Sequence, residues 1–282
     1  MLTTNNNLCC IIIPIYKNYL TDYEILSLKQ CCKILNNYKI IFVTYKKIDC
    51  SIYNDICNSF NVIFNYEYFN KYYFNNIIGY NSLLISKNFY LRFKEYKYIL
   101  IYQLDAYVFR DELEYWCNKE YDFIGAPWLK LDKSKPTVFF QEIYNIGNGG
   151  FSLRNTKNSL KKINYYINIL SVIRLFFSFY FEISNNRFKN ILNLLFFIFL
   201  FIPNKIIRII FFKSKFLKFN EDFIWSRLFY KDKNIPSPLE ASQFSFELYP
   251  EYLFILNNNK LPFGCHSWYS YYNYFFYKNH IT

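Results

Sequence analysis

The sequence predicts an α/β fold in which helices flank a mostly parallel sheet. Three observations support this class. Short apolar runs recur along the chain, segments with helical spacing of apolar residues lie between them, and 282 residues suit one large domain or one domain with an insertion. Alternating strands and helices are typical of parallel sheets. Hydrophobic residues make up 53% of the chain, which is ample for a core.

The first half of the chain follows this alternation. A buried strand is expected from Leu8 to Ile15, and a helix from Thr21 or Asp22 to Asn36. Further strands are expected at 39–45, 61–65 and 98–104, and apolar spacing predicts one helix over 81–93.

The second half is organised around a glycine-rich segment. A short strand is expected at 123–126, a polar loop at 132–136, and a turn from loop into strand in NGGFSLR at 148–154. A helix is expected from Asn220 to Tyr230, with Asn220 as its cap and two acids in its first turn. The segment after Leu261 is expected to be irregular and aromatic.

Most of the net charge lies in one apolar stretch. Residues 156–219 hold eleven Lys or Arg and one acid, Glu182, and so carry +10 of the net charge of +12. We predict a helical insertion here, within a single domain spanning 1–282. It either lies on an anionic membrane surface or forms buried helices with snorkelling lysines. No nucleic-acid partner is expected, because the basic residues are interleaved with Phe and Ile and no nucleic-acid motif is present.

Cysteine spacing and the N-terminal segment indicate in which cellular compartment the protein is expected. The eight cysteines show no C-x-x-C and no zinc spacing, which indicates reduced thiols. The N-terminal segment lacks a basic region and has a proline inside its apolar run, so it does not resemble a signal peptide. We therefore expect a cytoplasmic protein, peripheral on the inner face of the membrane if the insertion binds lipid.

The most informative feature is an aspartate at the end of an apolar strand. The run YILIYQL leads directly to Asp105, and the glycine-rich segment IGNGGF follows at 146–151. A strand ending in a carboxylate commonly holds a metal or a sugar at the rim of a parallel sheet, and glycines let the backbone approach that ligand. The alternative for Asp105 is a cap or turn. No phosphate-loop, serine-hydrolase or zincin motif is present.

Several ordered blocks resemble a known family. They are YILIYQLDAYVFRDELEYWC, YDFIGAPW, IGNGGFSLR, NEDFIW at 220–225 and LPFGCHSW at 261–268. Together they resemble a bacterial family of GT-A-like glycosyltransferases, mostly described as a domain of unknown function near surface-polysaccharide genes. The resemblance covers most of residues 8–155 and 219–270. It implies the nucleotide-diphospho-sugar transferase fold and a hexosyltransferase-like reaction. The donor would be a UDP- or GDP-linked sugar, and the acceptor a glycan or a lipid-linked molecule.

The resemblance also implies a metal site and a catalytic pair. Asp105 would bind the diphosphate or a divalent cation, Mn²⁺ or Mg²⁺, and His266 would complete the metal site. The D-x-D motif usual in GT-A enzymes reads Asp105-Ala-Tyr107 here, so the second carboxylate is missing and metal dependence stays open. Asp222 would be the base of an inverting reaction, and Glu221 would position the acceptor hydroxyl. The alternative for this pair is dipole stabilisation of a helix start.

Further donor contacts are implied at three places. Pro14, Tyr16 and Thr44 lie where GT-A folds hold the base and ribose, and Tyr16 would stack on the base; packing at strand ends is the alternative. Asn148 would donate to sugar hydroxyls. The sugar pocket would be shaped by Gly147, Asn148, Gly149 and Gly150. Arg154 would pair with phosphate or with an acid of the fold.

Two other classes of function stay open. The missing D-x-D acid fits a non-catalytic member of the fold that binds a nucleotide-sugar or a glycan. The basic insertion fits a scaffolding protein of the membrane interface.

Overall fold

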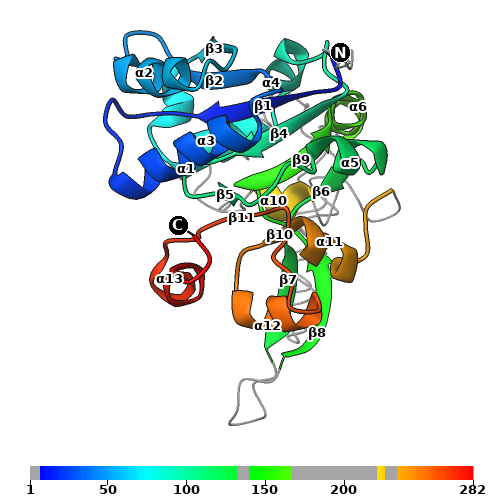
Figure 1. The fold of residues 1–282 in the computed structure, drawn as a ribbon. Helices are drawn as coiled ribbons and strands as arrows, with labels where there is room; N and C mark the ends of the chain where they lie inside the picture. The colour runs from blue at the N-terminus through cyan, green and yellow to red at the C-terminus, as the bar shows by residue number, and fades with distance from the viewer. Residues whose placement is uncertain (1–6, 132–139, 167–220, 226–233, 282) are drawn as a thin grey trace, which may run out of the picture.

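The computed structural model describes residues 7–131, 140–166, 221–225 and 234–281. Its central feature is a six-stranded sheet in the order β3-β2-β1-β4-β9-β6, drawn in the upper half of Figure 1. The strands are β1 (Cys9–Pro14), β2 (Ile40–Tyr45), β3 (Phe64–Phe69), β4 (Tyr98–Tyr102), β6 (Phe123–Ile124) and β9 (Phe151–Asn155). The first four are parallel, and β9 is antiparallel to both neighbours. The predicted α/β fold with a mostly parallel sheet is confirmed.

The middle strands are β1 and β4, which are also the most apolar. Every residue of β4 and all but the last residue of β1 are buried. Continuous apolar sequence of this kind is typical of parallel strands that are covered on both faces. The covering helices are α1 (Asp22–Ile34), α2 (Ser51–Ser59), η1 (Lys71–Phe74), α3 (Ile77–Leu84), α4 (Lys87–Arg92), α5 (Leu113–Asn118) and α6 (Thr156–Tyr166).

Two boundaries predicted from the sequence are wrong. One helix was expected over 81–93, but Ser86 divides the segment, because its hydroxyl accepts a hydrogen bond from the Phe89 backbone at 3.2 Å and so begins α4. The third strand was expected at 61–65 but runs from Phe64 to Phe69, where it pairs with the whole of β2. Helix α1 begins as expected, since Thr21 and Glu24 form a capping box.

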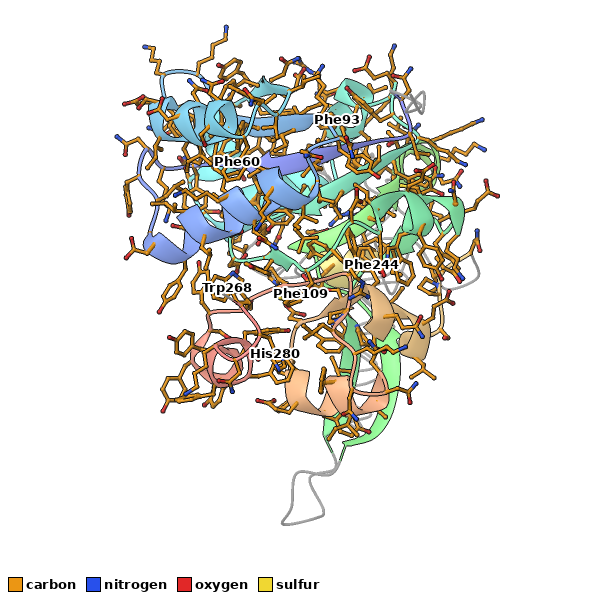
Figure 2. The ribbon with its side chains drawn as sticks, viewed as in Figure 1. Phe60, Phe93, Phe109, Phe244, Trp268 and His280 are labelled. Atoms are coloured by element: carbon orange, nitrogen blue, oxygen red, sulfur yellow. The ribbon has the colours of Figure 1, made fainter. Side chains whose placement is uncertain are left out.

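A smaller group of elements packs below the sheet (Figure 1). It contains the hairpin β7 (Pro127–Leu131) and β8 (Phe140–Ile146), and the three-stranded sheet β10 (Ser245–Phe246), β11 (Gly264–Cys265) and β5 (Tyr107–Val108). Its helices are α11 (Pro238–Phe244), α12 (Pro250–Leu256) and α13 (Tyr271–Tyr277). Aromatic side chains fill the space between these elements, among them Phe109 and Trp268 in Figure 2. The irregular tail expected after Leu261 is therefore wrong in part, because α13 is helical.

Some predictions fall outside the described residues. The helix expected over 220–230 is described only as α10 (Glu221–Ile224), and the insertion at 156–219 only as α6. The loop at 132–136 is likewise not described. All eight cysteines are free thiols, as expected. No helix in the described ranges is both long enough and apolar enough to span a membrane.

Candidate functional site

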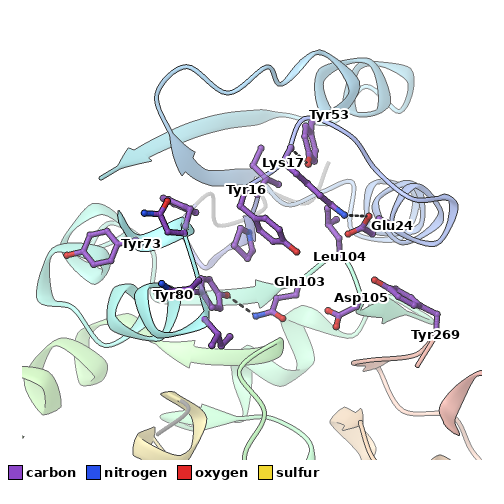
Figure 3. A pocket seen from close by; sticks show the side chains of 16 residues that line it. Tyr16, Lys17, Glu24, Tyr53, Tyr73, Tyr80, Gln103, Leu104, Asp105 and Tyr269 are labelled. Carbon is purple, nitrogen blue, oxygen red and sulfur yellow. Dashed lines mark hydrogen bonds and ion pairs between the residues drawn. The ribbon is translucent and has the colours of Figure 1, made fainter. Parts of the chain in front are cut away.

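A pocket of about 430 Å³ opens at the carboxyl ends of β1 and β4 (Figure 3). The chain leaves β1 towards β2 and β3 on one side and returns to β4 on the other, so the two parallel strands flank the point where strand order reverses. Open α/β sheets bind their ligands at this point, because the connections diverge there and leave a crevice. The pocket thus lies where the topology alone predicts a ligand.

The pocket wall is rich in aromatic side chains. Six of its residues are Tyr or Phe, namely Tyr16, Tyr53, Tyr73, Phe74, Tyr80 and Tyr269. Tyr16 is 60% exposed and stands at the rim. Lys17 is the one cation among the described lining residues, and its Nζ lies 2.7 Å from the Glu24 carboxylate, which also accepts from Thr21. Asp105 and Gln103 form the floor on the β4 side.

His266 reaches Asp105 because two very short strands pair. In the β11–β5 ladder, Cys265 is the partner of Tyr107, so the residue after Cys265 comes beside the residues before Tyr107. The Trp268 backbone N–H also donates to the Asp105 carbonyl at 3.2 Å. As a result, His266 Nε2 lies 3.1 Å from Asp105 Oδ1, although 161 positions separate the two residues (266 − 105).

The imidazole of His266 lies between two carboxylates and an amide. Its Nδ1 is 3.0 Å from Glu247 Oε1, and its Nε2 is also 3.2 Å from Gln103 Oε1. Burial by itself lowers the pKa of His266, but Asp105 and Glu247 outweigh burial and raise the pKa to about 10. For Asp105 the effects run the other way. Burial by itself raises the pKa of Asp105, but the charge of His266 and its hydrogen bond outweigh burial and hold this pKa below its usual value.

The glycine-rich turn between β8 and β9 packs directly against this group. The Gln103 backbone N–H donates to the Gly150 carbonyl at 2.8 Å, which ties the turn to the end of β4. A Cβ atom on Gly150 would lie 2.0 Å from His266 Nε2, so only glycine fits beside the ring. Asn148 adopts a left-handed conformation with φ of 74°, which asparagine tolerates better than most residues. Its side chain caps the turn by accepting from the Gly150 backbone.

We expect Gly150→Ala to displace the His266 ring and to lower the stability of the fold. Overpacking of this kind costs about 1–3 kcal/mol. Thermal unfolding measures the loss. In the double variant Gly150→Ala/His266→Ala the clash is gone, so its stability should match that of His266→Ala alone. Wild-type stability in Gly150→Ala would show that the close packing is not rigid.

A buried ion pair holds the other side of the turn. Arg154 Nη2 lies 3.0 Å from Glu221 Oε1, and their side chains are 0% and 4% exposed. Arg154 also donates to the Tyr90 hydroxyl at 3.1 Å. A Cβ atom on Gly149 would lie 1.7 Å from Glu221 Oε1. The start of α10, and with it Asp222, is therefore fixed against the turn.

Burial and charge act in opposite directions on this ion pair. Burial raises the pKa of Glu221 and Arg154 opposes it, and the net shift is upward. Of the two alternatives for Arg154, phosphate or an acid of the fold, the structure shows the acid.

A family model with the description "Protein of unknown function (DUF5672)" matches residues 63–266. This range is more than two thirds of the 282 residues. The chain belongs to the DUF5672 family. The matched range contains Asp105, the glycine-rich turn, the start of α10 and His266.

Outside the DUF5672 family, the similarities are distant. No curated protein matches the chain. Among solved structures, the chain is similar to core-mannan synthase A (CmsA/Ktr4) from Aspergillus fumigatus in its Mn/GDP form, at 10% identity and a TM-score of 0.40, over 58% of this chain. This chain covers 65% of that synthase chain, which is less than two thirds. It is also similar to A197 from STIV, at 13% identity and a TM-score of 0.28, over 55% of this chain and 68% of that chain.

Most of the predicted site residues of this DUF5672 member fall into three groups. Asp105, His266 and Gly150 form the first, and Glu221, Gly149 and Asp222 the second, with Asp222 half-buried at the start of α10. Pro14 and Tyr16 line the pocket and form the third. Thr44, Gly147, Asn148, Gly149 and Gly150 do not line it. Thr44 is fully buried in β2, so its predicted contact with the ribose stays a prediction.

The sequence did not identify four side chains that now belong to the site. Gln103 and Tyr80 are hydrogen-bonded to each other in the pocket, Tyr269 forms part of its wall, and Glu247 contacts His266. Gln103 carried a signal, since it is a polar residue at the end of an apolar strand. Glu247 follows a strand of only two residues, which gives no periodicity to read.

The donor atoms at Asp105 fit a divalent cation. No group of three or more His, Cys, Asp or Glu side chains in the described residues is arranged as a metal site. One carboxylate and one imidazole nitrogen do converge, however, and the Gln103 amide oxygen lies beside them. Carboxylate, carbonyl oxygen and imidazole suit Mn²⁺, and Mg²⁺ commonly uses few protein ligands together with substrate phosphates and water. The residues present therefore fit the predicted cation.

Proposed function

We propose that this protein is a glycosyltransferase that moves a sugar from a UDP- or GDP-linked donor to a glycan or lipid-linked acceptor. One observation carries the proposal. Asp105 forms part of the floor of the pocket at the point of strand-order reversal, and His266 contacts Asp105 from behind with the glycine-rich turn packed against the ring. A nucleotide-sugar needs an apolar slot for its base and compensation for its diphosphate. The aromatic wall and the floor at Asp105 are the proposed counterparts.

The aromatic wall is suited to the nucleoside. Tyr16 presents an exposed ring at the rim, on which a base can stack, and Tyr53 and Tyr80 enclose the interior. The pocket runs from Tyr16 to Asp105, so a nucleoside at the aromatic end would direct its diphosphate towards Asp105. The sugar would then lie near the glycine-rich turn, where Asn148 is proposed to donate to its hydroxyl groups.

The charges lining the pocket favour a cation-assisted reaction. Lys17 is already paired with Glu24, and Asp105 adds negative charge, so the described lining residues leave no unpaired cation for a diphosphate. Asp105 and His266 would hold a divalent cation. When bound, that cation would neutralise the diphosphate leaving group. Binding of a cation by Asp105 and His266 is itself part of the proposed function.

Asp222 is the proposed base that removes the proton from the acceptor hydroxyl in an inverting reaction. It begins α10 beside Glu221, which Arg154 holds in place. Direct contact between Glu221 and the acceptor was predicted from the sequence and stays a prediction. Burial and pairing with Arg154 favour a role for Glu221 in positioning the turn.

Residues 156–219 remain the proposed contact with an anionic membrane surface, where a lipid-linked acceptor for surface polysaccharide would be found.

One observation favours a rival function, the non-catalytic binding of nucleotide-sugar. Tyr107, at the position of the second D-x-D acid, is 4% exposed and packs with Trp268 at 5.7 Å between ring centroids. Titration calorimetry with UDP- and GDP-sugars, combined with an assay for released nucleotide in the presence of acceptor extracts, separates the two functions. Binding with turnover supports the transferase. Binding with no turnover under any of these conditions supports the rival, and no binding contradicts both.

Replacing Asp105 with alanine is expected to weaken binding of the donor at least tenfold. The change removes the carboxylate from the floor of the pocket and leaves His266 without one of its two acidic partners. Titration calorimetry with the donor measures the effect, and Asp55→Ala on the exposed face of α2 is the matched control. Removing divalent cations with EDTA should weaken donor binding to the wild type in the same way. Unchanged affinity in EDTA would argue against a cation at Asp105.

A further inference from the structure

We propose that Gln103 supplies the oxygen ligand that Tyr107 cannot, so that Asp105, Gln103 and His266 together bind a divalent cation, with Glu247 orienting the imidazole. The role of this cation in sugar transfer rests on the proposed function, but its binding can be measured without any sugar. In the D-x-D motif the second acid would stand at position 107, which is Tyr107 in this chain. The geometry points to the residue two positions before Asp105 instead.

The spacing of the three donor atoms supports a shared cation. His266 Nε2 lies 3.1 Å from Asp105 Oδ1 and 3.2 Å from Gln103 Oε1. Ligands about 2.1 Å from an octahedral cation lie about 3.0 Å from their nearest neighbours. Both measured separations are close to this value. A cation bound to these three atoms would therefore require little movement of the side chains.

The orientation of the Gln103 amide is fixed from both ends. Its Nε2 donates to the Tyr80 hydroxyl at 3.0 Å, which turns Oε1 towards His266. Its backbone N–H donates to Gly150, so the residue is also tied to the glycine-rich turn. An amide held in this way presents a fixed oxygen to the pocket.

Tyr107 is on the wrong side of Asp105 to contribute. It pairs with Cys265 in the small sheet, and its ring packs against Phe109 and Trp268 in the lower core. A carboxylate in that position would be buried among aromatic rings. Gln103, by contrast, lines the pocket beside Asp105 (Figure 3).

Glu247 completes the arrangement from behind the ring. Its Oε1 lies 3.0 Å from His266 Nδ1, on the side away from Asp105. A carboxylate at Nδ1 keeps the proton on that nitrogen and leaves Nε2 free to bind a cation, as is usual for histidine ligands. The β10–β11 pairing sets this contact, because the His266 backbone N–H donates to the Phe246 carbonyl at 2.9 Å. Glu247 is thus a positioning residue and not itself a ligand.

The test is Mn²⁺ binding to the full chain without nucleotide, measured by electron paramagnetic resonance of the free ion. Gln103→Met keeps the length of the side chain but removes its oxygen, and should weaken binding at least tenfold. Gln103→Glu adds a second carboxylate and should tighten binding about tenfold, since Mn²⁺ prefers anionic oxygen. Gln243→Met, on the exposed face of α11, is the matched control and should change nothing. Pulsed measurements should also detect coupling to the His266 nitrogen in the wild type.

Several outcomes would overturn the site. The first is the absence of saturable Mn²⁺ binding in the wild type, the second is binding to Gln103→Met as tight as to the wild type, and the third is binding to Gln103→Glu no tighter than to the wild type. Glu247→Gln is expected to weaken binding about tenfold, and an unchanged affinity would remove Glu247 from the proposal. These results are distinguishable from failure of the transferase proposal, because donor binding and turnover are measured separately. A chain that transfers sugar without binding Mn²⁺ would contradict only this site.

Discussion

Asp222→Asn is expected to abolish sugar transfer while leaving affinity for the nucleotide-sugar unchanged. Asparagine has the shape of aspartate but does not accept the proton that the acceptor hydroxyl must lose. General bases contribute about 10²- to 10⁴-fold to rate, so kcat should fall by that order. Donor binding should persist because Asp222 lies at the start of α10, which contributes no residue to the pocket lining among the described residues. Turnover assays and titration calorimetry on the same variant measure the two quantities.

The control for this variant is a carboxylate with no proposed role. Asp55 is exposed on α2, and Asp55→Asn should change neither quantity. Near-normal turnover in Asp222→Asn would remove Asp222 as the base. Loss of donor affinity together with turnover would assign the residue to the donor site.

Arg154→Met is expected to lower the free energy of unfolding by about 3–5 kcal/mol. The substitution leaves the Glu221 carboxylate buried and without its cation, which is the costly way to break a buried pair. It also removes the hydrogen bond to the Tyr90 hydroxyl. Urea unfolding of the purified variant measures the loss. A secondary effect on activity should follow, since the pair fixes the glycine-rich turn against α10.

Two comparisons make this prediction specific. In the double variant Arg154→Met/Glu221→Leu no charge is left unpaired, so most of the stability should return. Arg92 and Glu67 form an exposed pair at 3.0 Å, with side chains 54% and 30% exposed, and Arg92→Met should cost at most about 1 kcal/mol. If Arg154→Met cost no more than Arg92→Met, the buried pair would not be what holds the turn.

The parts of the fold that depend on local sequence could be predicted. Strands β1 and β4 are continuous apolar runs, and the parallel sheet that they imply is observed. The start of α1 could be predicted from Thr21 and Glu24, which form a capping box in the structure. Asp105 was placed at a strand end by the same reasoning, and parallel pairing of β1 with β4 is enough to bring it to the pocket.

The rest of the site depends on pairings that leave no periodic pattern. Strands β5, β10 and β11 have two residues each, yet they bring His266 to Asp105 and Glu247 to His266. The resemblance implied that His266 completes a metal site with Asp105, but no local pattern in the sequence brings the two residues together. The ion pair between Arg154 and Glu221 joins residues 67 positions apart, and only the packed structure decides between phosphate and acid as the partner of Arg154.

The most direct test of the central claim is a crystal of the protein soaked with UDP or GDP and MnCl₂, with diffraction recorded near the manganese absorption edge. We expect a nucleoside against the aromatic wall near Tyr16 and a diphosphate directed at Asp105. We also expect an anomalous peak among Asp105, Gln103 and His266. A nucleotide bound elsewhere on the surface, or a pocket without nucleotide at saturating concentration in solution and crystal, would rule out the proposed donor site.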